Sequence, residues 1–346
     1  MRPDFSVQIP NKDTFTILQI TDMQVIDAGQ QRYPERLCVQ SQIDWATDTV
    51  ERNCYAPIRT SVSETKPDLI VITGDIVYGE FDDAGTALTD FLRFMGSFGI
   101  PWAPVYGNHD NESARGVDEQ CAKYANAENC LFARGSVTGN CNYTVGLYDG
   151  DDLVRVLYMM DSNACYGGTD PKLTKRTGPA PDQIAWMGDC AKAFEAEAGH
   201  PVPGFVCMHI PPMDMADAVV AAGYQDAELC AARDQQGGFS VGAPAPECDH
   251  VLPPHTPGDC GCKIEEMREG ACSPRMERAL LDAHADGVFA GHFHQNNLSV
   301  AKNGIRYTCG VKCGYYDYRT EGQLGCTKIT FSDGMKHFAV TPIYHD

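Results

Sequence analysis

Residues 68–75, DLIVITGD, indicate the fold more directly than any other stretch of this sequence. Its apolar run is rich in β-branched residues and has the length of a single strand. The run ends at Gly74 and Asp75, which place a carboxylate directly after the strand. A lone Gly-Asp in that position is usually only a turn. The pattern therefore gains meaning only if it recurs along the chain.

The pattern recurs at four other places, each a strand-length apolar run followed at once by a metal-capable or acid–base residue. The runs are FTILQIT before Asp22-Met23-Gln24, PWAPVY before Gly107-Asn108-His109-Asp110, GFVCM before His209, and GVFA before Gly291-His292-Phe293-His294. Helical patterns are expected at residues 34–53, 84–98 and 181–198, and from Ser273 onward. Strands alternating with helices predict an α/β fold with a mainly parallel sheet, and ligands bind at the carboxyl ends of such strands. The C-terminal segments GIRYTC, GCTKITFS and KHFAVTPIY predict antiparallel strands.

Length and composition predict one large domain over residues 1–346. The chain has 346 residues, of which 43% are hydrophobic and 21% charged, as in ordinary globular proteins. Residues 211–273 are rich in Pro, Gly, Ala and Cys, and we interpret them as an irregular insertion into that domain. No apolar run approaches the roughly 20 residues that a membrane helix needs. A membrane role is therefore not expected.

The net charge indicates which partners the protein can bind, and the cysteine content bears on its cellular compartment. A formal net charge of −20 disfavours nucleic acid, although bound divalent cations can still attract a small phosphate ester. The sequence begins without an apolar leader, and a chain of this length does not need disulfide staples. We therefore expect the 16 cysteines to be reduced in the cytoplasm. Secretion, with disulfides and a removed leader, is the alternative.

The strand-end residues form a set of oxygen and imidazole donors. They are two carboxylates, two amides and three imidazoles: Asp22, Gln24, Asp75, Asn108, His209, His292 and His294. Such donors suit Mn, Fe, Zn or Mg rather than a thiolate zinc site, and seven ligands suit two ions that share one carboxylate. Two metal ions can clamp a phosphate and stabilise an in-line displacement. His109 would then stabilise the transition state or protonate the leaving oxygen.

The ordered motifs DMQ, GD, GNHD, H and GHFH resemble the calcineurin-like metallophosphoesterase superfamily. FTILQITD, MHIPPMD and GHFHQNN are similar to its purple-acid-phosphatase-like branch, which lacks the tyrosine ligand of the purple enzymes. The resemblance implies a four-layer α/β/β/α sandwich of two mixed sheets over a dinuclear metal centre. It assigns Asp22, Gln24, Asp75 and His294 to metal one and Asp75, Asn108, His209 and His292 to metal two, with Asp75 bridging and His109 catalytic.

The implied activity is phosphomonoester hydrolysis by a hydroxide held between the two metals. A phosphodiesterase or a nucleotide hydrolase would use the same centre with a different pocket. Gln24 departs from the family pattern, because histidine is usual at its position. We expect its amide oxygen to ligate, favouring manganese, iron or magnesium over zinc there. If it does not, a degenerate centre would leave a protein that only binds metal or a phosphorylated ligand.

Several further residues have both a functional and an ordinary interpretation. Cys248, His250, His255, Cys260 and Cys262 are candidates for an accessory zinc site or a simple loop. Arg32, Arg36 and Lys312 are candidates for phosphate contacts, although a solvated surface charge is the more common role. Tyr315, Tyr316 and Tyr318 either line the pocket or pack, and Asp161 either supports the site or forms a turn.

Overall fold

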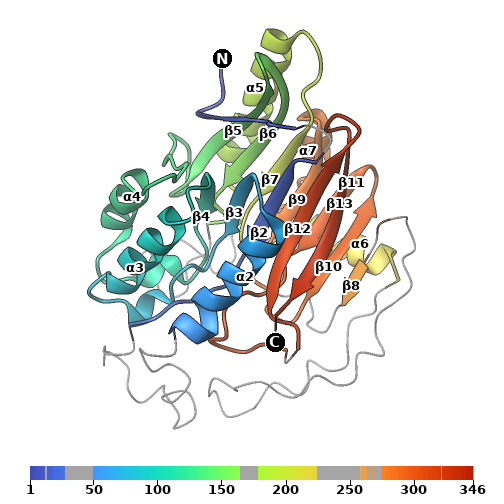
Figure 1. Ribbon diagram of the computed structural model, residues 1–346. Helices are drawn as coiled ribbons and strands as arrows, with labels where there is room; N and C mark the ends of the chain where they lie inside the picture. The colour runs from blue at the N-terminus through green and yellow to red at the C-terminus, as the bar shows by residue number, and fades with distance from the viewer. Residues whose placement is uncertain are drawn as a thin grey trace.

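The computed structural model describes residues 1–11, 14–27, 50–163, 178–223, 258, 260–262, 267, 274–320 and 322–345. Two β-sheets pack face to face, and helices cover their outer faces (Figure 1). This is the four-layer α/β/β/α sandwich of two mixed sheets expected from the sequence.

The smaller sheet contains the first three strand ends of the motif pattern. Its order is β13 (His337–Tyr344), β12 (Gly325–Ser332), β2 (Thr16–Ile20), β3 (Leu69–Thr73) and β4 (Trp102–Val105). Strands β2, β3 and β4 run parallel, whereas β12 and β13 pair antiparallel. Both the parallel β2–β4 group and the antiparallel C-terminal strands agree with the predictions.

The larger sheet contains the histidine-bearing strand ends. Its order is β1 (Phe5–Gln8), β5 (Asn142–Asp149), β6 (Asp152–Met160), β7 (Gly204–Cys207), β9 (Ala285–Ala290), β11 (Ile305–Cys309), β10 (Asn297–Lys302) and β8 (Cys260–Cys262). Strands β6, β7, β9 and β11 are parallel, and β5, β10 and β8 add antiparallel neighbours. The carboxyl ends of the parallel strands lead into His209 and His292.

The helices agree with most of the sequence predictions. On the smaller sheet lie η3 (Glu51–Tyr55), α2 (Ala56–Thr65), α3 (Thr86–Gly96) and α4 (Val117–Ala125); on the larger lie α5 (Pro181–Ala198), α6 (Met213–Ala221) and α7 (Glu277–Asp282). The short helices η4 (Gly79–Phe81) and η5 (Asp110–Glu112) follow the strand ends of β3 and β4. The predictions over 84–98 and 181–198 are confirmed by α3 and α5. Most of the helix expected at 34–53 lies outside the described residues.

One part of the expected irregular insertion is a regular helix. Helix α6 occupies Met213–Ala221, where the sequence predicted irregular chain from Pro211. Its Met215, Ala218 and Val219 are buried against the larger sheet, so an apolar helical face outweighs the surrounding proline and glycine content. Residues 224–257 of the insertion lie outside the described residues.

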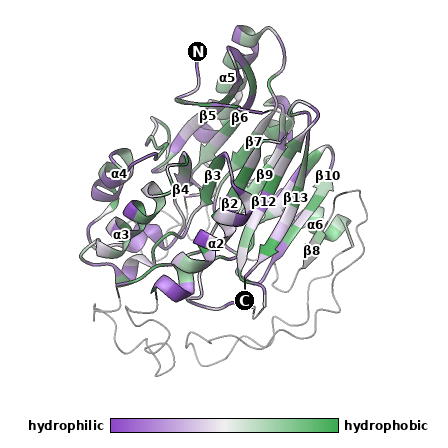
Figure 2. Ribbon diagram, in the orientation of Figure 1, coloured by the Kyte–Doolittle hydropathy of each residue, from purple (hydrophilic) through white to green (hydrophobic). Residues whose placement is uncertain are grey.

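Two apolar cores hold the layers together. Between the sheets, Phe205 of β7 stacks on Phe331 of β12 with ring centroids 5.5 Å apart. A second core lies between the larger sheet and α5, α6 and α7. The central strands are strongly hydrophobic, whereas α2, α3 and α4 carry hydrophilic residues (Figure 2). The buried strands therefore form a rigid base for the loops at their carboxyl ends.

Candidate metal centre

The loops after the strands hold their polar residues in an unusual backbone conformation. Asp22, Gln24, Asp75 and His292 have φ values of 55°, 48°, 50° and 73°. Residues with a Cβ atom seldom adopt this left-handed region, and such strain is concentrated at functional sites. The tight packing also explains one glycine of the motifs, because a Cβ atom on Gly107 would lie 2.1 Å from Oδ1 of Asp75.

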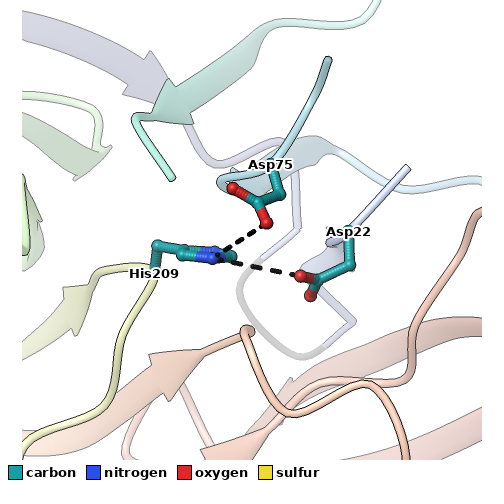
Figure 3. A group of neighbouring side chains, drawn as sticks. All are labelled: Asp22, Asp75 and His209. Atoms are coloured by element: carbon teal, nitrogen blue, oxygen red, sulfur yellow. Dashed lines mark ion pairs between the residues drawn. The ribbon is translucent and has the colours of Figure 1, made fainter. Parts of the chain in front are cut away.

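Three buried side chains from three strand ends converge at one point. Nε2 of His209 lies 3.3 Å from Oδ2 of Asp75 and 4.0 Å from Oδ1 of Asp22 (Figure 3). One ligand atom from each residue lies within 4.8 Å of the others, and all three residues are buried. Two carboxylates and an imidazole in this arrangement are a suitable donor set for a divalent cation.

Asn108 and His292 extend this cluster. Oδ1 of Asn108 lies 3.1 Å from Nε2 of His209 and 3.0 Å from Nδ1 of His292. Asp75, Asn108, His209 and His292 thus make contact in one group, which we call the His209 side. The sequence predicted these four residues as the ligands of metal two.

Backbone carbonyls fix the orientation of two imidazoles. Nδ1 of His209 donates to the carbonyl oxygen of Thr73 at 2.8 Å, so its Nε2 faces the carboxylates. Nδ1 of His294 likewise donates to the carbonyl oxygen of Tyr318 at 3.0 Å, and its Nε2 lies 3.3 Å from Oδ1 of Asp22. Ligand histidines in metal sites are commonly oriented by such a bond from the other ring nitrogen.

The two carboxylates of the centre stay ionised although they are buried. Burial alone would raise the pKa of Asp75, but His209 and His109 outweigh it and hold that pKa below its usual range. Burial would also raise the pKa of Asp22, yet His294 and His209 lower it to about 2. Conversely, burial favours a lower pKa for His209, and the Asp75 carboxylate raises it to about 9. Two ionised buried carboxylates thus attract any available cation.

One carboxylate oxygen is left without a hydrogen bond. Asp22 is buried, and its Oδ2 accepts from the Thr21 hydroxyl at 2.7 Å and the His292 amide at 3.1 Å. Its Oδ1 has no hydrogen-bond partner within the described part of the chain. Leaving a buried carboxylate oxygen unsatisfied is costly, and a bound metal ion would satisfy it. The residues present therefore fit a metal.

Gln24 is placed at the centre, but its amide oxygen already has a partner. The Lys312 ammonium donates to Oε1 of Gln24 at 2.7 Å and to the carbonyl oxygen of Asp22 at 2.9 Å. The Nε2 group of Gln24 lies toward Asp75, 3.4 Å from Oδ2. Asp22, Gln24, His294 and Lys312 form the opposite half of the centre, which we call the Gln24 side. Ligation of a metal by Gln24 stays a prediction.

The interpretation of Lys312 as a surface charge is wrong. Lys312 is 1% exposed, and its backbone lies alongside that of Thr21 in a parallel bridge. Burial lowers the pKa of Lys312, while Asp22, Asp317 and Asp75 act to raise it. No local pattern in the sequence indicates this contact, because Lys312 and Gln24 are 288 residues apart.

His109 lies beside the cluster and is oriented by an acidic residue that the sequence analysis did not identify. The His109 amide donates to Oδ1 of Asp75 at 2.9 Å, and Nδ1 of the ring lies 2.8 Å from Oε2 of Glu112. Tyr78 stacks on the His109 ring with centroids 4.1 Å apart. Burial would lower the His109 pKa, but Asp75 and Glu112 raise it to about 9. A protonated imidazole is suited to act as an acid.

The remaining candidates have varied outcomes. Tyr318 stacks on His294 at 4.1 Å, whereas Tyr316 is buried among Ile26, Tyr78 and Phe81 and serves packing. Asp161 accepts hydrogen bonds from the backbone amides of Asn140 and Asn163, as in a turn.

Buried cysteines such as Cys54 and Cys207 are free thiols. Arg32, Arg36, Cys248, His250 and His255 lie outside the described residues, so the accessory zinc site stays a prediction.

In the described part of the chain, no helix is both long and apolar enough to cross a membrane.

Similarity to known proteins supports the assignment of the fold. The chain is 24% identical over 349 aligned residues to probable inactive purple acid phosphatase 14 of Arabidopsis thaliana, covering 90% of this chain and 72% of that protein. It is 33% identical to probable inactive purple acid phosphatase 28 of the same plant over 112 residues, which are 32% of this chain and 27% of that protein. A dimetal phosphatase from Danio rerio has the same fold, with a TM-score of 0.50 at 11% identity over 96% of this chain and 99% of that one.

Residues 15–296 match the calcineurin-like phosphoesterase family, and this range includes all five strand ends of the motif pattern. The two Arabidopsis relatives are named as probable inactive purple acid phosphatases. The chain therefore belongs to the calcineurin-like phosphoesterase family.

Proposed function

We propose that this protein is a metal-dependent phosphoester hydrolase whose favoured substrates are small phosphate monoesters. The observation that carries this proposal is the convergence of Asp22, Asp75 and His209, with one Asp22 oxygen left unsatisfied. A bound metal ion polarises phosphoryl oxygens and activates water, which is the chemistry that this family uses. Asp75, Asn108, His209 and His292 would hold such an ion, and His294 and Gln24 are the further ligands that a second ion would need.

The protein's own residues supply the rest of the reaction. Glu112 holds the His109 ring in one orientation, and Tyr78 stacks against it. His109 would bind the substrate phosphate and donate a proton to the leaving oxygen, which needs a protonated ring at neutral pH. The neighbouring carboxylates of Asp75 and Glu112 favour that protonated form. A stacked and hydrogen-bonded ring is positioned before substrate arrives, which favours catalysis.

A small monoester suits the charge of the molecule. The formal net charge of −20 repels extended polyanions, so nucleic acid is a poor substrate. A phosphodiesterase or nucleotide hydrolase would use the same residues with a different surrounding pocket. The names of the relatives and the engagement of Gln24 by Lys312 favour a second candidate, a protein that binds metal and phosphate without turnover.

Turnover of aryl phosphates by metal-loaded protein tests the proposal. We expect hydrolysis of an aryl phosphate monoester, slower hydrolysis of the matching diester, and loss of both after chelation with recovery on adding Mn²⁺. Faster diester turnover would favour the phosphodiesterase. Tight binding of inorganic phosphate or tungstate with no turnover under Mn, Fe, Zn or Mg would overturn catalysis in favour of the binding protein.

A further inference from the structure

The Gln24 side already contains a cation that belongs to the chain. The Lys312 ammonium donates at 2.7 Å to the same Gln24 oxygen that a metal ion would need, and at 2.9 Å to the carbonyl oxygen of Asp22. Both acceptors are carbonyl oxygens, so neither bond neutralises its charge. The acidic groups around Lys312 are Asp22, Asp75 and Asp317. The positive charge of Lys312 is thus balanced by the carboxylates that would otherwise serve a metal.

The backbone holds Lys312 in this position. Thr21 and Lys312 form a parallel bridge, and the amide of Cys313 donates to the carbonyl oxygen of Thr21 at 2.9 Å. The amide of Gly314 donates to the carbonyl oxygen of Asp22 at 3.2 Å. A Cβ atom on Gly314 would lie 2.0 Å from the carbonyl oxygen of Met23, so the two segments are in close contact. Lys312 cannot leave the centre by a small shift of a surface loop.

An ion on the Gln24 side would therefore face direct competition. A metal ion bound to Oε1 of Gln24 would share that oxygen with the ammonium group, and two cations on one oxygen repel strongly in a buried site. Gln24 is buried, and its amide nitrogen is 3.4 Å from Oδ2 of Asp75. Turning the amide over would bring its NH₂ group against the Lys312 ammonium. Gln24 is thus locked with its oxygen toward Lys312.

Among the described residues, no lysine or arginine side chain is in contact with the ligand atoms of the His209 side. In the described part of the chain, Asn108 contacts His209 and His292, and Asp75 contacts His209, Gln24 and the His109 amide. The unsatisfied Oδ1 of Asp22 lies between the two sides, 3.3 Å from Nε2 of His294 and 4.0 Å from Nε2 of His209, so an ion on the His209 side would still be near it. One ion on this side would not compete with the Lys312 ammonium for an oxygen.

We propose that this centre binds one metal ion, on the His209 side, and that the Lys312 ammonium replaces the second ion on the Gln24 side. The inference rests on the proposed metal centre and changes the expected number of ions from two to one. Lys312 supplies a fixed single charge in place of a divalent ion, and it can hold a substrate oxygen only by hydrogen bonds. The inference gives Lys312 and Gln24 a joint role, which explains why Gln24 replaces the usual histidine.

The number of bound ions tests this inference without relying on activity. Purified protein is loaded with Mn²⁺ and freed of excess metal, then measured by elemental analysis and by electron paramagnetic resonance. We expect about one equivalent and the spectrum of an isolated ion, rather than a coupled pair. About two equivalents with a coupled spectrum would overturn the inference and leave the proposed function standing. No bound metal at all would overturn the metal centre itself.

Variants on the Gln24 side test whether Lys312 is the reason that only one ion binds. The double variant Gln24→His with Lys312→Met removes the internal cation and restores an imidazole, so binding is expected to rise from about one equivalent to about two. Gln24→His alone is expected to stay near one equivalent, because Lys312 remains. The matched control is Lys328→Met, which removes a lysine from β12 outside the centre. Two ions in Gln24→His alone, or one ion in a folded double variant, would overturn the role of Lys312. The wild-type spectrum decides the question if the double variant does not fold.

Discussion

The two sides of the centre use similar loops for different purposes. On the His209 side, Asp75, Asn108, His209 and His292 contact one another, and Thr73 orients His209. On the Gln24 side, the Lys312 ammonium donates to Gln24 and to the backbone of Asp22. Both sides are built on left-handed residues after parallel strands. Under the proposed single-ion centre, both sides keep the same kind of backbone while the Lys312 charge replaces the ion on one of them.

Because the two sides differ, membership of the family does not by itself establish which chemistry this centre performs. The fold and the order of the motifs belong to the calcineurin-like phosphoesterase family. The relatives with the word inactive in their names show that membership does not by itself establish turnover. Under the proposed function, activity depends on the His209 side of the centre and on His109.

The largest expected effect comes from Asp75, which contacts both sides. Asp75→Asn removes a charge that any bound ion needs, so metal content should fall to background. Turnover should decrease about a thousandfold or more, since metal ions contribute several kcal/mol to such reactions. Elemental analysis and aryl phosphate turnover measure the two effects. The matched control is Asp90→Asn, at an exposed position of α3, which should change neither quantity. An active Asp75→Asn protein would show that turnover does not depend on the carboxylate shared by the two sides.

His109→Ala should separate catalysis from metal binding. We expect turnover to decrease by about 10²–10⁴, the usual contribution of a general acid, while the metal content stays unchanged. Both are measured on the same preparation. If the variant keeps full turnover, another group donates the proton, and the role proposed for His109 is wrong.

Glu112→Gln should have a smaller effect through the position of His109. Loss of the carboxylate 2.8 Å from Nδ1 should lower kcat by about ten- to a hundredfold with little change in KM. The same substitution in a His109→Ala background should have almost no further effect, because both residues then act as one unit. Glu119→Gln, on the exposed face of α4, is the matched control. Additive losses in the double variant would show that Glu112 acts independently.

The smallest effect is expected for His294, in contrast to His209. His294→Ala should keep about one metal equivalent and lose less than about tenfold in turnover, since it lies on the side of the centre that Lys312 occupies. His209→Ala should lose the ion. Metal content of the two alanine variants, measured in parallel, gives the comparison. Loss of metal in His294→Ala with retention in His209→Ala would place the ion on the Gln24 side instead of the His209 side.

Local sequence patterns were sufficient to predict the strand ends and the two long helices. Strands β2, β3, β4, β7 and β9 are short apolar runs followed by polar residues, so both the strand and its functional end are encoded in adjacent positions. Parallel neighbours in one sheet end at the same edge, so Asp22 and Asp75, after β2 and β3, had to lie close together. His209 follows β7 of the other sheet, so its approach to them depends on how the two sheets pack, which no local pattern encodes.

Contacts between distant segments could not be predicted in the same way. Lys312 follows β11 and reaches Gln24 through a bridge to the chain after β2, which no local pattern encodes. Helix α6 was also missed, because its short apolar face lies among prolines and glycines. The contact of Glu112 with His109 was partly predictable, because Glu112 follows His109 by three residues, the spacing at which side chains meet in one helical turn.

The most direct test of the difference between the two sides is an anomalous diffraction map at the manganese edge, from crystals grown with excess Mn²⁺. We expect one peak, surrounded by Asp75, Asn108, His209 and His292, with the Lys312 ammonium still bonded to the Gln24 oxygen. Two peaks that share Asp75 would contradict the single-ion centre. So would a single peak on the Gln24 side, with Lys312 displaced or its nitrogen bound to the ion.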